Sequence, residues 1–356
     1  MKKTLNKTKI ADFATYIGVV IAFIVMNALM NEGLLTRSMK GQLVPICCYI
    51  VLAVPRKLSA TILGELTLGQ AIGSSLGAFT GVVTAMSLQS AIPSDGVRLA
   101  LAIVMGAIFA GIAGTLVGIP VLRLHGDYLA IVTLAFGEII KELINCLIIG
   151  HDENGLHIIF NATGAKTVTD LGLTETGKVL IKGAQGATGT DTIASFTAGF
   201  ILIMVTLVVV LNLARSRSGR AIMALRDNRI AAESVGINVT KYKLMAFVTS
   251  AALAGGAGAL YGLNFSNLVS SKFDFNTSIL ILVFVVLGGL GNMWGSIIAA
   301  AVLTVLPEAL RGFADYRMLI YAIVLIVVML ATNSPQMKAL LSKLVPFGKK
   351  GEKEHA

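Results

Sequence analysis

Ten apolar runs occupy the larger part of this chain of 356 residues. A helix of about 20 mostly apolar residues is long enough to cross the hydrocarbon core of a bilayer. The composition agrees with that reading, because 55% of the residues are hydrophobic and only 13% are charged, about half the charged share of a soluble domain. The sequence therefore predicts an all-α polytopic membrane protein with about ten transmembrane helices.

The predicted spans share a high apolar content and few charges, and they lie near residues 11–30, 43–55, 62–88, 97–120, 127–149, 193–214, 243–264, 277–290, 292–308 and 317–332. Two regions are interrupted by glycine. Small residues let membrane helices break or approach one another closely. We therefore expect Gly-rich broken segments, with one helix break at Gly288, Gly289, Gly291 and Asn292.

Basic residues indicate the orientation of the spans. With the N-terminus in the cytoplasm, nineteen of the 29 Lys and Arg residues fall in cytoplasmic segments, Arg56 and Lys57 among them, and nine fall outside. Cytoplasmic loops carry an excess of Lys and Arg. The sequence thus predicts that both termini are cytoplasmic, that 333–356 is a basic cytoplasmic tail and that 150–192 is an extracytoplasmic loop.

The sequence contains no pattern typical of an enzyme or a metal site. It has no phosphate-binding G-x-x-x-x-G-K-[ST] loop, and its Gly-rich GGLGNMWG stretch lies between apolar helices rather than after a strand. The four histidines and three cysteines have no metal-ligand spacing. We expect no catalytic residue, no metal ligand and no cofactor bound by this chain.

Polar residues in the third span are candidates for a solute path. Polar groups are costly in lipid and are therefore functional candidates by default. Glu65, Thr67 and Gln70 lie there beside Gly69 and Gly73. For the glycines, close helix packing is an equally good explanation.

A second polar cluster follows at 125–147. Asp127 is a plausible N-cap for the next helix. Glu138 and Lys141 are three residues apart, so they are neighbours on one helix face and are expected to form an ion pair. Glu142 is left needing water or another subunit. Glu138 joins the candidate path residues.

The most charged stretch is 215–242, which the topology places in the cytoplasm. One helix face collects mostly small residues, namely Ala221, Ala224, Leu225, Ala231, Ala232 and Val235. Arg226, Arg229 and Glu233 lie on the other face, and Gly236 is a suitable C-terminal stop. Such a helix can enter a groove on a soluble partner. A basic loop that only fixes topology and contacts lipid headgroups explains the pattern equally well.

Four stretches resemble the permease subunits of branched-chain amino acid ABC importers, in particular the LivM-like half. They are LTLGQAIGSSLGAF, LRLHGDYLAIVTLAFGEII, the long segment from SRSGRAIMALRDNRIAAESVG through GGAGALYG, and VVLGGLGNMWGSIIAAAVLTVLPEALR. They keep the family's order. The sequence departs from the family pattern in the loop after the fifth span and at Glu65.

The resemblance implies a single transmembrane permease domain over residues 1–356, in the bacterial cytoplasmic membrane. It also implies partners: a paralogous LivH-like permease subunit, two cytoplasmic ATPase subunits that bind ATP and Mg²⁺, and an extracytoplasmic solute-binding protein. The loop 215–242 would be the ATPase-coupling segment. Its coupling residues would be Arg220, Arg226, Arg229, Ala231, Ala232, Glu233 and Gly236.

Two alternatives stay open at this point. The same architecture could import urea, short amides or nucleosides. An ion-coupled secondary transporter could instead use Glu65, Glu138 and Lys141. Uptake that survives ATP depletion would favour this second alternative.

Overall fold

The computed structural model describes residues 2–33, 36–57, 67, 69–89, 91–124, 126–152, 155–161, 168–172, 177–289, 293–310 and 316–333. The chain divides into two compact units, Met1–Ala301 and Val302–Ala356, and each is described by itself. The second unit holds the end of α11 and all of α12.

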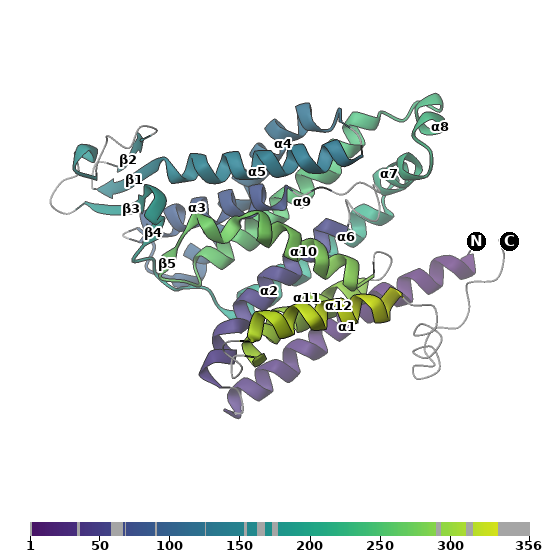
Figure 1. Ribbon diagram of the computed structural model, residues 1–356, viewed down its shortest axis with the longest axis horizontal. Coiled ribbons are helices and arrows are strands. Elements are labelled where there is room, and N and C mark those ends of the chain that lie inside the picture. Colours follow the sequence, from purple (N-terminus) through teal and green to yellow (C-terminus); the bar gives the residue numbers. More distant parts are fainter. Residues whose placement is uncertain are drawn as a thin grey trace. The chain divides into compact units, whose positions relative to one another are not determined.

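The chain is mostly helical (Figure 1). The helices are α1 (Lys2–Asn31), α2 (Arg37–Lys57), α3 (Gln70–Ser87), α4 (Asp95–Val121), α5 (Asp127–Asn145), α6 (Phe196–Arg215), α7 (Arg217–Asp227), α8 (Arg229–Ser234), α9 (Val239–Gly262), α10 (Phe275–Leu287), α11 (Met293–Ala309) and α12 (Arg317–Asn333). Each of the ten apolar ranges therefore contains a helix.

Six helical segments of the described chain are long and apolar enough to cross a membrane. They are Phe13–Asn31, Arg37–Lys57, Asp95–Val121, Phe196–Arg215, Val239–Gly262 and Ser270–Leu287. The other predicted spans correspond to helices that are shorter or more polar, such as α5 with its Glu138, Lys141 and Glu142. The structure thus agrees with a polytopic, mostly helical protein.

Helices α3, α4 and α9 form the centre of the first unit and pack through small residues. A Cβ on Gly77 would lie 2.1 Å from the carbonyl oxygen of Gly255, so α3 and α9 approach this closely only because position 77 is glycine. A Cβ on Gly255 would in turn lie 2.5 Å from the carbonyl oxygen of Gly106 on α4. A Cβ on Gly73 would likewise lie 2.6 Å from the carbonyl oxygen of Ala251. Close approach through small residues is typical of membrane helices, which gain stability by packing rather than by burying apolar surface from water.

A five-stranded antiparallel sheet, absent from the sequence prediction, follows α5. The strands are β1 (Leu147–Asp152), β2 (Gly155–Phe160), β3 (Lys178–Lys182), β4 (Ala187–Thr188) and β5 (Asn267–Leu268), in the order β2-β1-β3-β4-β5. The expected span at 127–149 is therefore wrong at its end, because the helix stops at Asn145 and the chain continues as β1. The pairing of Ala187 with Leu268 joins two distant parts of the chain.

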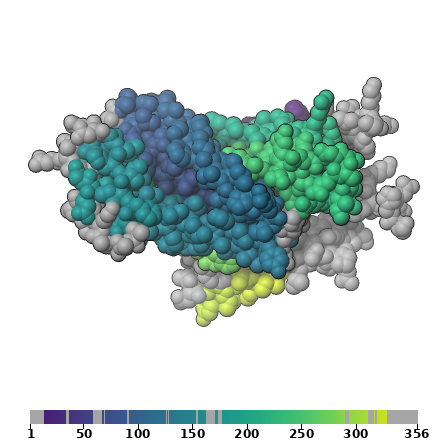
Figure 2. All heavy atoms as spheres, turned by 90° about the horizontal axis from the view of Figure 1, so that it is seen from above, coloured from purple at the N-terminus to yellow at the C-terminus, as the bar shows by residue number. Residues whose placement is uncertain are grey.

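The sheet and the α7–α8 pair lie at opposite ends of the first unit. α6 leads from the sheet side to α7, and α9 returns from α8 to β5 (Figure 1). These helices have 20 and 24 residues, so each spans about 30 to 36 Å at 1.5 Å per residue. Figure 2 shows the surface of α3–α5 between the sheet and the α7–α9 region.

Candidate functional site

The segment predicted as one helix after Arg215 is two short helices, which corrects the sequence interpretation. Asn228 has an extended backbone, with φ −156° and ψ 108°, and separates α7 from α8. Its side-chain Oδ1 accepts the N–H of Ala231 at 3.0 Å. Asn at an N-cap satisfies a backbone N–H that would otherwise lack a partner, which favours a new helix start over continuation of α7.

The end of α8 is fixed by a Schellman motif. Gly236 has φ +84°, a left-handed conformation that glycine adopts without the usual steric cost. The N–H of Gly236 donates to the carbonyl of Glu233 at 3.0 Å, and the N–H of Ile237 donates to that of Ala232 at 3.1 Å. These two bonds define the motif, so the predicted stop at Gly236 is present.

The apolar side chains of α7 and α8 divide into buried and exposed sets. Ile222 and Ala232 are buried at 0% and 4% exposure. Ile230 and Val235 are exposed at 80% and 75%. The predicted small-residue face is therefore wrong in part, because Ala231 and Val235 face outward and Ile222, which lies off that face, is inside.

Charged residues of this segment pair locally. The Nε of Arg229 donates to Glu233 Oε1 at 3.0 Å, one helical turn away. Arg226 pairs with its neighbour Asp227 at 3.1 Å, and Arg220 donates to the carbonyl of Arg215 at 3.1 Å. The surface of α8 thus combines paired charges with unusually exposed apolar side chains.

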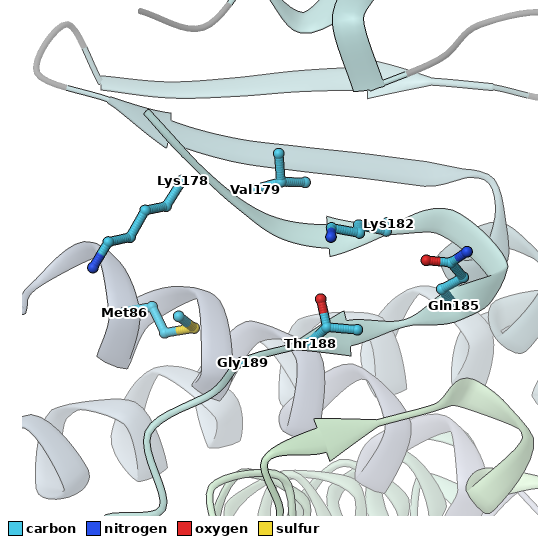
Figure 3. Close-up of a pocket in the computed structure, with 7 residues that line it drawn as sticks. All are labelled: Met86, Lys178, Val179, Lys182, Gln185, Thr188 and Gly189. Carbon is cyan, nitrogen blue, oxygen red and sulfur yellow. The ribbon is translucent and has the colours of Figure 1, made fainter. Parts of the chain in front are cut away.

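At the opposite end, a recess of about 560 Å³ lies between the sheet and the end of α3 (Figure 3). It is lined by Met86, Lys178, Val179, Lys182, Gln185, Thr188 and Gly189. Figure 3 shows the two lysines on β3, with Thr188 on the facing β4 and Gly189 directly after it. The two exposed ammonium groups make this recess positively charged.

Polar residues at the start of α3 contact α2 and α5. Gln70 is 8% exposed, and its Nε2 donates to the carbonyl of Leu52 at 2.7 Å. Gly69, the N-cap of α3, lies close to Thr133 of α5. Thr67 is half-buried, whereas Glu65 lies outside the described residues. Gln70 is therefore held by protein contacts, and Gly73 packs on α9.

The structure places Arg56 and Lys57 in a helix, not in a loop as the charge pattern predicts. The charge pattern predicts both as cytoplasmic loop residues, but they lie in the last turn of α2 and are 2% and 6% exposed. Arg56 donates through Nη1 to Gln70 Oε1 at 3.3 Å and through Nη2 to the carbonyl of Thr67 at 2.8 Å. No sequence pattern indicates this site, because a charge at the end of an apolar run is typical of a loop residue.

The ion pair predicted between Glu138 and Lys141 is present. Glu138 Oε1 also accepts the N–H of Phe275, the first residue of α10, at 3.1 Å. Glu142 accepts a hydrogen bond from Asn145 at 3.1 Å and lies 3.8 Å from Lys141, so it has partners within the chain. Glu138 thereby joins α5 to the beginning of α10.

Asp127 is not an N-cap, contrary to the prediction. α5 begins at Asp127, and Gly126, with φ +61°, occupies the N-cap position. Gly126 reaches this left-handed conformation without strain, so the turn before α5 needs no side-chain cap.

Gly288 and Gly289 follow the last residue of α10, and α11 begins at Met293. A Cβ on Gly288 would lie 2.4 Å from the backbone of Gly295, so the two helices meet closely at this interruption. Gly291 and Asn292 lie outside the described residues.

Comparison with known proteins places these features in context. The family model described as "branched-chain amino acid transport system / permease component" matches residues 38–330. The permease protein LivM of the high-affinity branched-chain amino acid transport system of Escherichia coli K12 is 33% identical over 292 residues, and LivM of Salmonella typhimurium is 32% identical over the same length. LivH of Salmonella typhimurium is 26% identical over 157 residues, 43% of this chain and 50% of that protein.

The LivM matches cover 79% of this chain and 66% of each LivM protein, so the matched part is just under two thirds of their length. No solved structure matches the chain.

Proposed function

This chain belongs to the branched-chain amino acid transport system permease family, and from that premise we propose that it is a permease subunit of an ABC importer for branched-chain amino acids. The observation that carries the proposal is the family match over residues 38–330. The chain itself would provide a membrane pathway and would perform no covalent chemistry.

In this proposal, residues 1–356 form one permease domain with ten crossings in a bacterial cytoplasmic membrane, and both termini lie in the cytoplasm. The sheet and the rest of 150–192 would then be extracytoplasmic, and 333–356 would be a cytoplasmic tail. The placement is supported by the opposite positions of the sheet and of α7–α8 along α6 and α9. The excess of basic residues in 215–243 favours the cytoplasmic side for α7–α8.

The α7–α8 segment would transmit the motion of the ATPase subunits to the permease. Ile230 and Val235 are exposed large apolar side chains on a short, well-capped element. Burying apolar side chains on association is favourable, and a few residues at the centre of an interface carry most of its binding energy. The exposed residues proposed for this contact are Arg220, Arg226, Arg229, Ala231 and Glu233, together with Ile230 and Val235. The buried Ala232 and the turn at Gly236 would hold α8 in position for it.

The partners would supply the remaining functions. A paralogous LivH-like permease would complete the pathway, and two ATPase subunits would bind ATP and Mg²⁺. A solute-binding protein would dock on the extracytoplasmic side, where the recess lined by Lys178 and Lys182 offers positive charge to an acidic surface.

The candidate path residues stay predictions. Glu65, Thr67, Gly69, Gln70, Gly73 and Glu138 would line or support the pathway. Gln70 and Glu138 contact neighbouring helices, so their effect on transport would come at least in part through those contacts.

Reconstitution tests the cargo. The chain is inserted in liposomes with its paralogous permease, its ATPase subunits and its binding protein, and uptake of labelled leucine, urea and uridine is measured. We expect ATP-dependent uptake of leucine. Uptake of urea or uridine but not of leucine would show that the proposed cargo is wrong. ATP hydrolysis by the purified chain alone would contradict the proposal that separate ATPase subunits hydrolyse ATP.

A further inference from the structure

The buried guanidinium of Arg56 has only neutral partners in the described part of the chain. These partners are the Gln70 side chain and the Thr67 carbonyl, and no described carboxylate pairs with it. The neighbouring Lys57 is also buried. Removing a charge from water without an opposite charge is costly, and inside a membrane protein such a residue is a functional candidate.

Arg56 differs in this respect from the other buried arginine among the described residues. Arg98 is 6% exposed, and it pairs with both Asp95 and Asp191. The charge of Arg98 is therefore compensated inside the chain. Arg56 has no such carboxylate partner among the described residues, so an anion that completes its environment would bind favourably.

The position of Arg56 along the membrane normal follows from its neighbours. Gly73 packs against Ala251, which is the thirteenth of the 24 residues of α9. Gln70 lies one helical turn before Gly73, and Arg56 is bonded to Gln70. At 1.5 Å per residue, Gln70 is about 5 Å from the middle of α9 along the helix axis. Gln70 Nε2 donates to the carbonyl of Leu52, and α2 continues five residues beyond Leu52 to Lys57, about 8 Å at 1.5 Å per residue. The Arg56 side chain therefore reaches Gln70, inside the bundle, from the last turn of α2.

The end of one helix and the start of another lie beside this cluster. α2 finishes at Lys57 and α3 begins at Gln70. The first N–H groups of a helix lack intrahelical partners and carry partial positive charge, which favours a nearby anion. In secondary transporters, helices interrupted near the bilayer midplane point their N-termini at anionic groups of the substrate, and the same physics applies here.

We propose that Arg56, with Lys57 and the N-terminus of α3, binds the carboxylate of the amino acid as it crosses the membrane. A guanidinium suits this role because its planar N–H groups match a carboxylate. Each branched-chain amino acid carries this carboxylate, so the site would accept the whole class and leave discrimination among side chains to other residues. The proposal rests on the import function proposed above.

The test uses the complete transporter in liposomes and measures leucine imported per ATP hydrolysed. Arg56→Gln should lower this ratio about tenfold or more, because a charge-assisted hydrogen bond is lost. Arg56→Lys keeps the charge and should give an intermediate ratio. Arg98→Gln, the matched control for loss of a buried arginine, should leave the ratio within about twofold of the wild type.

A second measurement remains informative even if the Arg56→Gln variant does not assemble into the transporter. Cys146 is replaced by Ser, and Thr67→Cys places a thiol beside Arg56. The rate at which this thiol is labelled is measured with and without leucine, once with Arg56 and once with Arg56→Lys. Leucine should slow labelling with Arg56 present, and Arg56→Lys should require a higher leucine concentration for the same protection.

The outcomes separate the two proposals. If the wild-type transporter imports no leucine, the proposed function fails. If it imports leucine, but Arg56→Gln keeps the wild-type ratio or leucine gives no protection, the carboxylate site is wrong and Arg56 only joins α2 to α3.

Discussion

The α8 helix and the α2–α3 junction hold their charges in opposite ways. On α8, Arg229 and Glu233 pair with each other at 41% and 47% side-chain exposure, while Ile230 is exposed. At the junction, Arg56 is 2% exposed and its described partners are neutral. An exposed pair contributes little to stability, whereas a buried unpaired charge is costly.

This difference indicates what each region can bind. α8 satisfies its charges within the chain and offers apolar side chains, so it suits a protein surface. The junction offers a charge, so it suits an anion. The two regions should therefore respond differently to the same kind of substitution.

The largest effect is expected at the exposed apolar residues of α8. Ile230→Glu should lower ATP-driven leucine uptake about thirtyfold or more, because the proposed apolar contact with the ATPase would be lost. The side chain is 80% exposed, so the amount of chain in the membrane should not change. Co-purification of the ATPase subunits measures the contact directly.

Leu156→Glu serves as the control, since Leu156 is an exposed apolar residue of β2 at the other end of the unit. It should leave ATPase co-purification unchanged. Equal loss of the ATPase in both variants, or full retention in Ile230→Glu, would remove α8 as the contact.

The next largest effect is expected at the end of α8. Gly236→Leu forces a side chain into a backbone with φ +84°, which costs about 1 to 2 kcal/mol. No atom lies within 4 Å of a Cβ there, so the change acts through backbone conformation alone. Leucine uptake should fall about tenfold if the end of α8 must hold its position.

Gly96→Leu is the matched control, because Gly96 also has open space around it and lies in helical backbone. Wild-type uptake in Gly236→Leu would show that the Schellman motif is dispensable for coupling.

Glu138 is intermediate between the two regions, since its side chain is 36% exposed and paired with Lys141. Glu138→Leu removes the acceptor of the Phe275 N–H and leaves Lys141 only the more distant Glu142, at 3.8 Å. It should lower the free energy of unfolding by about 1 to 3 kcal/mol. Glu138→Gln keeps an acceptor for Phe275 and should cost less. Equal unfolding midpoints for the two variants would show that the bond to α10 contributes nothing.

The smallest effect is expected for the charge pair on α8. The double variant Arg229→Gln, Glu233→Gln should change the free energy of unfolding by at most about 0.5 kcal/mol, as for other exposed i,i+4 pairs. Thermal unfolding of the purified chain measures this. A loss well above 1 kcal/mol would mean that the pair anchors α8, and the contrast with Arg56 would weaken.

The helices could be predicted because each apolar run is long enough to indicate one without tertiary information. The sheet could not. β4 and β5 have two residues each, and Ala187 pairs with Leu268 across 80 intervening residues, so no local pattern indicates the pairing. Short strands of this kind depend on contacts that form only in the folded chain.

At the candidate sites, sequence patterns predict contacts between residues close in the chain, but they do not predict which side chains are buried. The Glu138–Lys141 pair and the stop at Gly236 depend on neighbours within one or two helical turns. Asn228 was missed as a break because its capping bond competes with helix continuation, and propensity alone does not decide that competition. The burial of Arg56 depends on its contact with Gln70 of α3, a separate helix, so the local pattern around Arg56 does not indicate it.

The central claim is that the permease is driven by ATP through its partners. The most direct measurement is leucine uptake into liposomes that contain the full complex and the binding protein, energised either by ATP on the cytoplasmic face or by a proton or sodium gradient without ATP. The account predicts uptake with ATP alone, lowered about thirtyfold or more in Ile230→Glu. Uptake driven by the ion gradient without ATP would contradict it.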